Sequence, residues 1–193
     1  MNPVQIPPAF GGGFNTHEKR GAAFSQPTKN VGEGDRQGTP LWLYNLLRKE
    51  FRFDGDMFAD HGNALSPRYW TLESPIVPSA FDGVGLTLFA NPPYSRGNIR
   101  AAIETIRDLA NWGNTVVGLT RLEPTARWWS ILRPICSEVR LLDTRLTFRG
   151  QSQAYNFPCT VWVAVPPSQR RCEPHVWFWD CGAKWDDYFE SKK

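Results

Sequence analysis

The residues best suited to chemistry in this chain are four consecutive ones, Asn91-Pro92-Pro93-Tyr94. The Asn91 side chain offers a carbonyl acceptor, and Pro92, with a fixed φ and no N–H, offers only its backbone carbonyl. Two acceptors on one stiff turn suit a substrate that carries two donor hydrogens on a single atom, as a primary amine does. Tyr94 adds a flat face for stacking. The loop therefore predicts chemistry on a primary amine.

The exocyclic N6 amine of adenine fits this description. Its lone pair is delocalised into the ring, so the nitrogen is a poor nucleophile. Two acceptors that hold both hydrogens favour a tetrahedral nitrogen with its lone pair directed outward, which stabilises the developing charge. A methyl sulfonium held in line is then attacked directly, and positioning supplies much of the rate. Such a site needs no metal, but the base must leave a duplex to reach it.

A parallel sheet is expected to position this loop. The near-continuous apolar run from Val84 to Ala90 predicts a strand buried on both faces, and the two prolines end it. An amphipathic helix follows from Gly97 to Trp112, and then a second buried strand from Asn114 to Leu119. Ligands of open α/β sheets bind beyond the carboxyl ends of strands, which is where the loop falls.

Smaller elements flank this unit. Thr39 is expected to cap a helix whose first position is Pro40, and residues 51–59 to turn into a short strand. Residues 64–80, with three prolines, are expected to be mostly irregular. The remaining expectations are a short helix over 125–132 and strands at 138–142, 147–148, 160–165 and 176–179. Turns link the last three strands, which favours antiparallel pairing.

Composition predicts one globular domain in a chain of 193 residues. No segment approaches the roughly 20 apolar residues of a membrane span, and no secretory signal opens the chain, so a cytoplasmic protein is expected. Residues 1–38 have the composition of a flexible arm, and residues 184–193 form a polar tail. The domain is expected to occupy residues 39–183.

Charge and cysteine usage narrow the chemistry further. The net charge is only +3, but 16 of the 22 basic residues are Arg, the side chain best shaped for phosphate and base edges. The four Cys include no CxxC pair and are expected to be reduced thiols. Their spacing with His175 matches no common zinc finger, so no metal site is expected.

The wider pattern resembles a known family. Asn-Pro-Pro-Tyr after a buried strand is similar to the catalytic signature of amino-methyltransferases that act on DNA adenine. Over residues 36–166 the chain resembles the small phage and prophage DNA N6-adenine methyltransferases of the Dam type. The other matching segments are Thr39-Pro40 before a Leu-rich helix, Phe53-Asp54-Gly55-Asp56-Met57-Phe58-Ala59, which resembles an Asp-x-x-Ala cofactor segment, Arg127-Trp128-Trp129 and Arg145-Leu146-Thr147-Phe148.

This resemblance implies a Rossmann-like α/β methyltransferase fold, with a mixed, mostly parallel sheet and antiparallel C-terminal strands. It implies S-adenosylmethionine as cofactor and DNA, expected to be double-stranded, as partner, in the cytoplasm of a bacterial host. By resemblance the target adenine is held by Asn91, Pro92, Pro93 and Tyr94. The cofactor site would be lined by Thr39, Pro40, Asp56, Phe58 and Ala59, with Asp56 near the ammonium of the methionine moiety. DNA phosphates would be contacted by Arg96, Arg121, Arg127 and Arg145.

The chain departs from larger methyltransferases in three ways. Only Gly62 is available for a Gly-rich turn, and the ribose-binding acid is expected to be Glu73 or Asp82. No separate target-recognition domain is evident, which leaves loops 60–82 and 121–135 or the arm to recognise sequence. Two alternatives stay open. One is the same chemistry on cytosine N4, RNA adenine or a protein glutamine, and the other is a decayed fold that binds nucleic acid without catalysis.

Overall fold

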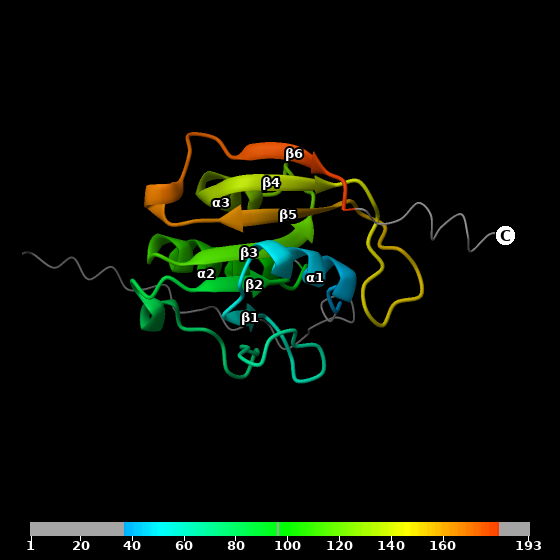
Figure 1. Ribbon diagram of the computed structural model, residues 1–193, viewed down its shortest axis with the longest axis horizontal. Helices are drawn as coiled ribbons and strands as arrows, with labels where there is room; N and C mark the ends of the chain where they lie inside the picture. The colour runs from blue at the N-terminus through cyan, green and yellow to red at the C-terminus, as the bar shows by residue number, and fades with distance from the viewer. Residues whose placement is uncertain (1–36, 96, 182–193) are drawn as a thin grey trace, which may run out of the picture.

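A six-stranded sheet with the order β1-β2-β3-β5-β4-β6 forms the centre of the protein (Figure 1). The structure is a computed structural model and describes residues 37–95 and 97–181. The strands are β1 (Gly55–Met57), β2 (Thr87–Ala90), β3 (Thr115–Arg121), β4 (Cys136–Leu142), β5 (Cys159–Ala164) and β6 (His175–Trp179). The predicted α/β class with a mixed sheet is confirmed.

Five strands share one direction, and β5 alone among the described strands runs against them. β1, β2 and β3 pair in parallel, and β5 pairs antiparallel with both β3 and β4. β6 pairs in parallel with β4. The prediction of an antiparallel last strand is therefore wrong in its pairing, because β6 skips its predecessor β5 and adds to the far side of β4.

Helices cover both faces of the sheet (Figure 1). α1 (Leu41–Glu50) lies on one face, where the ring of Tyr44 meets that of Phe89 on β2 at 5.1 Å between centroids. α2 (Asn98–Asn111) and the short α3 (Trp129–Leu132) lie on the other. The apolar stripe of α2 is buried as its helical spacing predicts, and it connects β2 to its parallel neighbour β3.

The start of α1 differs from the sequence prediction. The helix begins at Leu41, with Pro40 at the capping position and no side-chain hydrogen bond to the first turn. Thr39 is buried rather than serving as a cap. Because the fixed φ of Pro40 directs the chain into the helix, the side chain of Thr39 is not needed as a cap.

Two predicted strand segments are wrong. The strand expected from Val84 begins only at Thr87, because Gly83 and Gly85 adopt φ of 67° and 74°, a left-handed conformation that strands do not use. Residues 147–148 form no strand. Phe148 is buried as a core side chain, and the next residue, Arg149, makes a single antiparallel bridge to Gly38.

The centre of the sheet requires a glycine at one position. A Cβ on Gly118 of β3 would lie 2.1 Å from the ring of Trp162 on β5, which is its direct cross-strand partner. The indole Nε1 of Trp162 also donates to Thr120 Oγ1 at 3.1 Å. The large ring therefore fills the space above Gly118 and joins the parallel strands to β5.

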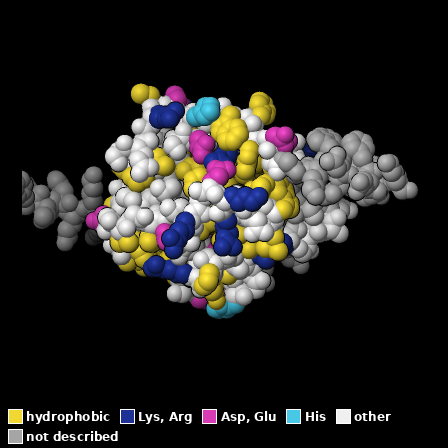
Figure 2. Space-filling view, in the orientation of Figure 1, with side chains coloured by type: hydrophobic (Ala, Val, Ile, Leu, Met, Phe, Trp, Pro, Cys, Tyr) yellow, Lys and Arg dark blue, Asp and Glu magenta, His cyan; other side chains and the backbone are white. Residues whose placement is uncertain are grey.

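The free edge of β6 carries apolar side chains to the surface, where hydrophobic atoms are visible along that edge (Figure 2). Val176 is 54% exposed and Phe178 is 80% exposed.

No helix within the described residues is long and apolar enough to cross a membrane. Across the same residues, no group of three His, Cys, Asp or Glu side chains is placed to hold a metal ion.

Candidate active site

The carboxyl ends of β1 and β2 bring two predicted site segments side by side. Met57 is the register partner of Ala90, so the residues that follow, Phe58 and Asn91, leave the sheet as neighbours. Phe58 has φ of 58°, the only positive φ at a non-glycine position in the described part of the chain. Such a conformation costs on the order of 1–3 kcal/mol and concentrates at functional sites.

A narrow recess of about 20 Å³ lies at this edge and is called here the closed recess. That volume holds one group of the size of a water molecule or an ammonium. Four of the five residues predicted for the cofactor line it, and the fifth, Pro40, does not. The lining consists of Gln37, Gly38, Thr39, Asp56, Met57, Phe58, Ala59, Asn63, Leu65 and Asn91.

Asp56 supplies the carboxylate of the closed recess and is only 4% exposed. Burial raises the pKa of its carboxyl to about 7, while the N–H of Leu65, which donates to Oδ2 at 2.9 Å, and the charge of Arg149 lower that pKa. The side-chain oxygen Oε1 of Gln37 is also buried there and accepts no hydrogen bond from the described residues. Two of the residues that line this space of ammonium size therefore carry buried acceptors.

Arg149 holds the walls of the closed recess together and was not predicted from the sequence. Its backbone N–H donates to the carbonyl of Gly38 at 2.7 Å, and its Nη2 donates to the carbonyl of Asn63. A Cβ on Gly38 would lie 3.0 Å from Arg149 Nε, so the glycine gives the guanidinium room. No spacing signal joins positions 38, 63 and 149, because they meet only in the fold.

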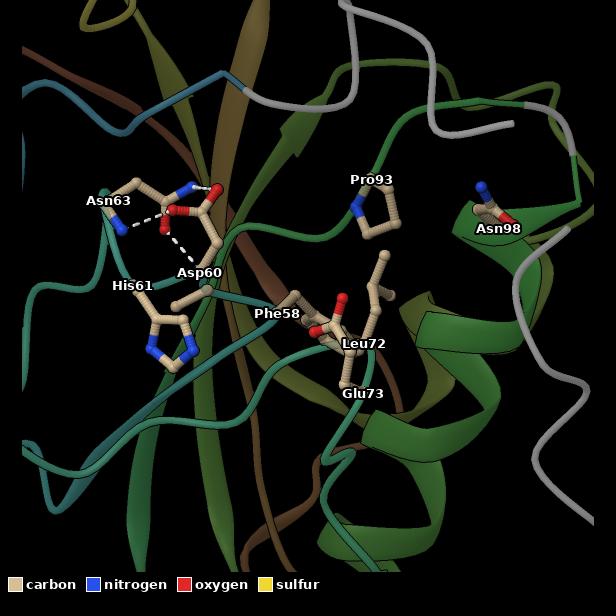
Figure 3. A pocket seen from close by; sticks show the side chains of 10 residues that line it. Phe58, Asp60, His61, Asn63, Leu72, Glu73, Pro93 and Asn98 are labelled. Atoms are coloured by element: carbon tan, nitrogen blue, oxygen red, sulfur yellow. Dashed lines mark hydrogen bonds between the residues drawn. The ribbon is translucent and has the colours of Figure 1, made fainter. Parts of the chain in front are cut away.

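A larger hollow of about 400 Å³, the main cavity, adjoins the closed recess and shares Phe58, Ala59 and Asn63 with it (Figure 3). Figure 3 shows Phe58, Leu72 and Pro93 around the apolar part of this space, with Asn98 on α2 at its far side. Cavities of roughly 300–1,000 Å³ are typical of small-molecule sites. The remaining lining residues are Asp60, His61, Gly62 and Glu73.

The loop after β1 is folded by its own polar side chains. Asp60 Oδ1 accepts from the N–H of Gly62 at 2.7 Å, and Oδ2 accepts from Asn63 Nδ2 at 3.0 Å (Figure 3). A single aspartate thus closes the turn around the one glycine available there. Of the two acids predicted for a ribose, Glu73 lines the main cavity and Asp82 does not.

Hydrogen bonds at both ends fix the Asn91 amide. Nδ2 donates to the carbonyl of Gln37 at 2.8 Å, and Oδ1 accepts from the hydroxyl of Tyr94 at 3.0 Å. These partners settle which side of the amide carries the acceptor. The Tyr94 hydroxyl has a second acceptor, the carbonyl of Leu119, at 3.3 Å. It can therefore release Asn91 Oδ1 and keep a partner.

Tyr94 is buried to 8% exposure in an aromatic cluster with Phe148 and Tyr155, whose ring centroids lie 6.2 and 6.0 Å from its own. Burial raises the pKa of its hydroxyl well above the ordinary value. The side chain is therefore a neutral hydrogen-bond donor rather than a base at any physiological pH.

Beyond Tyr94 lies a third hollow of about 690 Å³, the basic cavity. Arg121 and Arg127, both predicted to contact DNA, line it together with Arg100, which was not predicted. Arg100 pairs with Glu104 and Arg121 with Glu123, whereas Arg127 is exposed on the rim. The rest of the lining is Tyr94, Gly97, Ile99, Glu123, Ala126 and Trp128.

The other predicted residues lie apart or cannot be placed. Arg145 does not line the basic cavity, and its Nη1 donates to the carbonyl of Asn156 at 3.1 Å. Trp128 and Trp129 are buried against each other as core side chains. Arg96 lies outside the described residues, and so does all of the predicted arm except Gln37 and Gly38.

The Asn-Pro-Pro-Tyr loop thus follows β2 of a mixed α/β sheet and lies beside the buried carboxyl group of Asp56. The sequence model of the family described as DNA N-6-adenine-methyltransferase (Dam) matches residues 26–170, and the chain belongs to this family. S-adenosylmethionine is the cofactor of the family.

Comparison with individual proteins adds little to this assignment. A predicted O-methyltransferase from Agrobacterium tumefaciens is similar among solved structures, at 16% identity and a TM-score of 0.29. The alignment covers 48% of this chain and 39% of that one. A search of curated proteins finds no match.

The residues present fit S-adenosylmethionine. The closed recess has ammonium size and is lined by Asp56, with its buried carboxyl group, and by Gln37, whose Oε1 accepts no hydrogen bond from the described residues. The adjoining main cavity is large enough for the rest of a small molecule and has both apolar and polar walls.

Proposed function

We propose that this protein transfers a methyl group from S-adenosylmethionine to the N6 amine of adenine in double-stranded DNA. The observation that carries the proposal is the position of the loop 91–94. Within this loop, Asn91 lines the closed recess, Pro93 lines the main cavity and Tyr94 lines the basic cavity. A loop that borders a cofactor-sized hollow and a basic one is where two such substrates meet.

Asp56 and Gln37 are the residues proposed to hold the ammonium of the cofactor, with Thr39 and the backbone of Phe58 and Ala59 around it. Glu73 is the acid proposed to hold the ribose, since it lines the main cavity. When bound, S-adenosylmethionine supplies an electrophilic methyl group. Asp56 pairs with a cation only as a carboxylate, so its raised pKa makes recognition depend on its deprotonation.

Asn91 and Pro92 are proposed to hold the target amine. Asn91 Oδ1 already faces the hydroxyl of Tyr94, a hydrogen-bond donor, and an incoming N–H would take that donor's place. The hydroxyl then keeps the Leu119 carbonyl as its acceptor. The Pro92 carbonyl accepts the second hydrogen of the amine, which directs the nitrogen lone pair away from the loop. Pro93 stiffens the turn that sets these positions.

The basic cavity is proposed to receive the DNA. Arg127 and Arg121 lie around it with Arg100, and Tyr94 lines the same space, so a base that enters meets both cations and a ring. Arg145 and Arg96 extend the proposed phosphate contacts beyond the cavity. Residues 39–183 are proposed as the catalytic unit, with Gln37 and Gly38 of the predicted arm added to it because they line the closed recess. The cytoplasm of a bacterial host is proposed as its location.

Product analysis tests this function. Purified protein is incubated with unmethylated duplex DNA and labelled S-adenosylmethionine, and the DNA is digested to nucleosides that are then separated. Label in N6-methyladenine nucleoside is the expected result. Label in N4-methylcytosine would preserve the mechanism and change the base. Absence of label together with absence of cofactor binding would establish a decayed fold.

A further inference from the structure

A half-exposed aromatic ring stands at the rim of the basic cavity. Phe157 is 50% exposed and belongs to the segment between β4 and β5, which leaves the sheet at the same edge as the loop 91–94. Single exposed apolar side chains are common and need no explanation by themselves. Phe157 differs because it contacts Arg121, a lining residue of the basic cavity, at 5.4 Å from guanidinium carbon to ring centroid.

The ring is exposed yet fixed. Behind it lies Tyr155, with the two centroids 5.5 Å apart. The backbone on each side is held as well, since the Pro158 carbonyl accepts from the N–H of Leu122 at 2.8 Å and the Asn156 carbonyl accepts from Arg145. A rigid apolar surface in water is held ready for a partner rather than forming on contact.

A line of rings joins this rim to the catalytic loop. Tyr155 contacts both Phe157 and Tyr94, so one ring separates the exposed side chain from the residue that lines the target pocket. A base that leaves the duplex opens a gap in the stack, and the unpaired and unstacked state is costly. Proteins fill such gaps with apolar side chains inserted between base steps.

We propose that Phe157 enters the duplex at the position that the target adenine vacates, as a positioning residue for base flipping. Arg121, which also pairs with Glu123, supports the ring from the protein side. This role rests on the proposed function, and it concerns only a duplex substrate. A single-stranded target has no stack to refill.

The test compares Phe157→Ala with wild type on unmethylated plasmid DNA in native duplex form and after heat denaturation, by counting methylated nucleosides. On duplex we expect a loss of methylation rate of about ten-fold or more, the scale of losing one stacking contact. On denatured DNA we expect the rate of wild type. Phe157→Leu keeps an apolar wedge and should recover most of the duplex rate, and Phe178→Ala, an exposed Phe on β6, should match wild type on both.

A second measurement follows the base directly. In a duplex with 2-aminopurine at a methylated position mapped from the product, wild type should raise the fluorescence and Phe157→Ala should raise it less. If Phe157→Ala lowers the methylation rate equally on duplex and denatured DNA, or does not lower it on duplex, the role of Phe157 in base flipping is overturned and the proposed function stands. If the wild-type protein binds the cofactor but methylates neither form of DNA, the proposed function is overturned, and so is the role of Phe157 that rests on it.

Discussion

The closed recess and the basic cavity lie on either side of one loop and differ in almost every property. The recess is about 20 Å³ and is lined by Asp56, which is 4% exposed, and by Gln37, whose side-chain oxygen has no hydrogen-bond donor in the described part of the chain. The basic cavity is about 690 Å³ and is lined by three Arg, by Glu123, which pairs with Arg121, and by aromatic side chains. The first suits a small ligand held in one pose, and the second suits a large anion that binds and leaves. Mutations on the two sides should therefore have separable effects.

The largest effect is expected at the residue between the two regions. Asn91→Ala removes the side-chain acceptor for the amine and should lower the turnover number by roughly 10²–10³-fold, as loss of one preorganised polar group does at other sites. DNA affinity should change little, and cofactor affinity should fall by less than the turnover number, because the Asn91 amide also donates to the carbonyl of Gln37 at the closed recess. Single-turnover methylation measures the step directly. Asn111→Ala, at the end of α2 with its Oδ1 bound to Arg170, is the matched control.

Loss of charge in the closed recess should affect only the cofactor. Asp56→Asn keeps an acceptor for the Leu65 N–H but removes the partner of a cation, so cofactor affinity should fall by about ten- to a hundred-fold. Isothermal titration measures it, and DNA affinity by gel shift should stay unchanged. Asp54→Asn, an exposed neighbour that accepts from Thr87, should bind cofactor as wild type does. If Asp56→Asn also lost DNA affinity, the closed recess and the basic cavity would not be functionally separate.

The pH dependence of cofactor binding should sharpen the same distinction. Because the pKa of Asp56 is raised to about 7, this carboxyl is protonated in the free protein below that pH and must lose its proton to pair with a cation. Affinity should therefore fall as pH decreases below 7, approaching tenfold per pH unit. In Asp56→Asn the dependence between pH 5.5 and 7 should be flat. An unchanged slope in that variant would assign the titration to another group.

The smallest effect is expected on the basic side. Arg127→Gln should weaken DNA binding by about three- to tenfold and reduce the slope of log affinity against log salt by about 0.9. Fluorescence anisotropy at several salt concentrations provides both values. Cofactor affinity should be unaffected. Arg133→Gln removes an exposed Arg that pairs with Glu173 outside the cavity, and its salt slope should equal that of wild type.

Sequence patterns predicted the local parts of the site well. Hydrophobic patterns that span only neighbouring residues predict the buried strand before Asn91, the apolar stripe of α2 and the strand β3. Asp56, Phe58 and Asn91 lie together because parallel strands end at one edge of the sheet, which topology alone implies. The family resemblance found over residues 36–166 lies within the match at 26–170.

The parts that could not be predicted depend on contacts distant in sequence. Arg149 reaches Gly38 and Asn63 from more than 80 positions away along the chain, and Gln37 meets Asn91 across 54 positions. The false start of a strand at Val84 has a local cause, since an apolar run says nothing of the positive φ that Gly83 and Gly85 adopt. The pairing of β6 with β4 was not predicted, because a short connection after β5 does not reveal that the chain passes β5 and β4 to reach the far side of β4.

The central place of β5 has a consequence for how the protein is synthesised. β3 and β4 do not pair with each other, and each pairs with β5, whose residues 159–164 come after both. On a ribosome, the edge of β3 must stay open, and the space above Gly118 unfilled, until Trp162 emerges. The sheet therefore closes late, through pairing distant in sequence. A nascent chain that ends before residue 159 presents three strand edges without their later partners, one on β3 and both on β4, to the cell's chaperones.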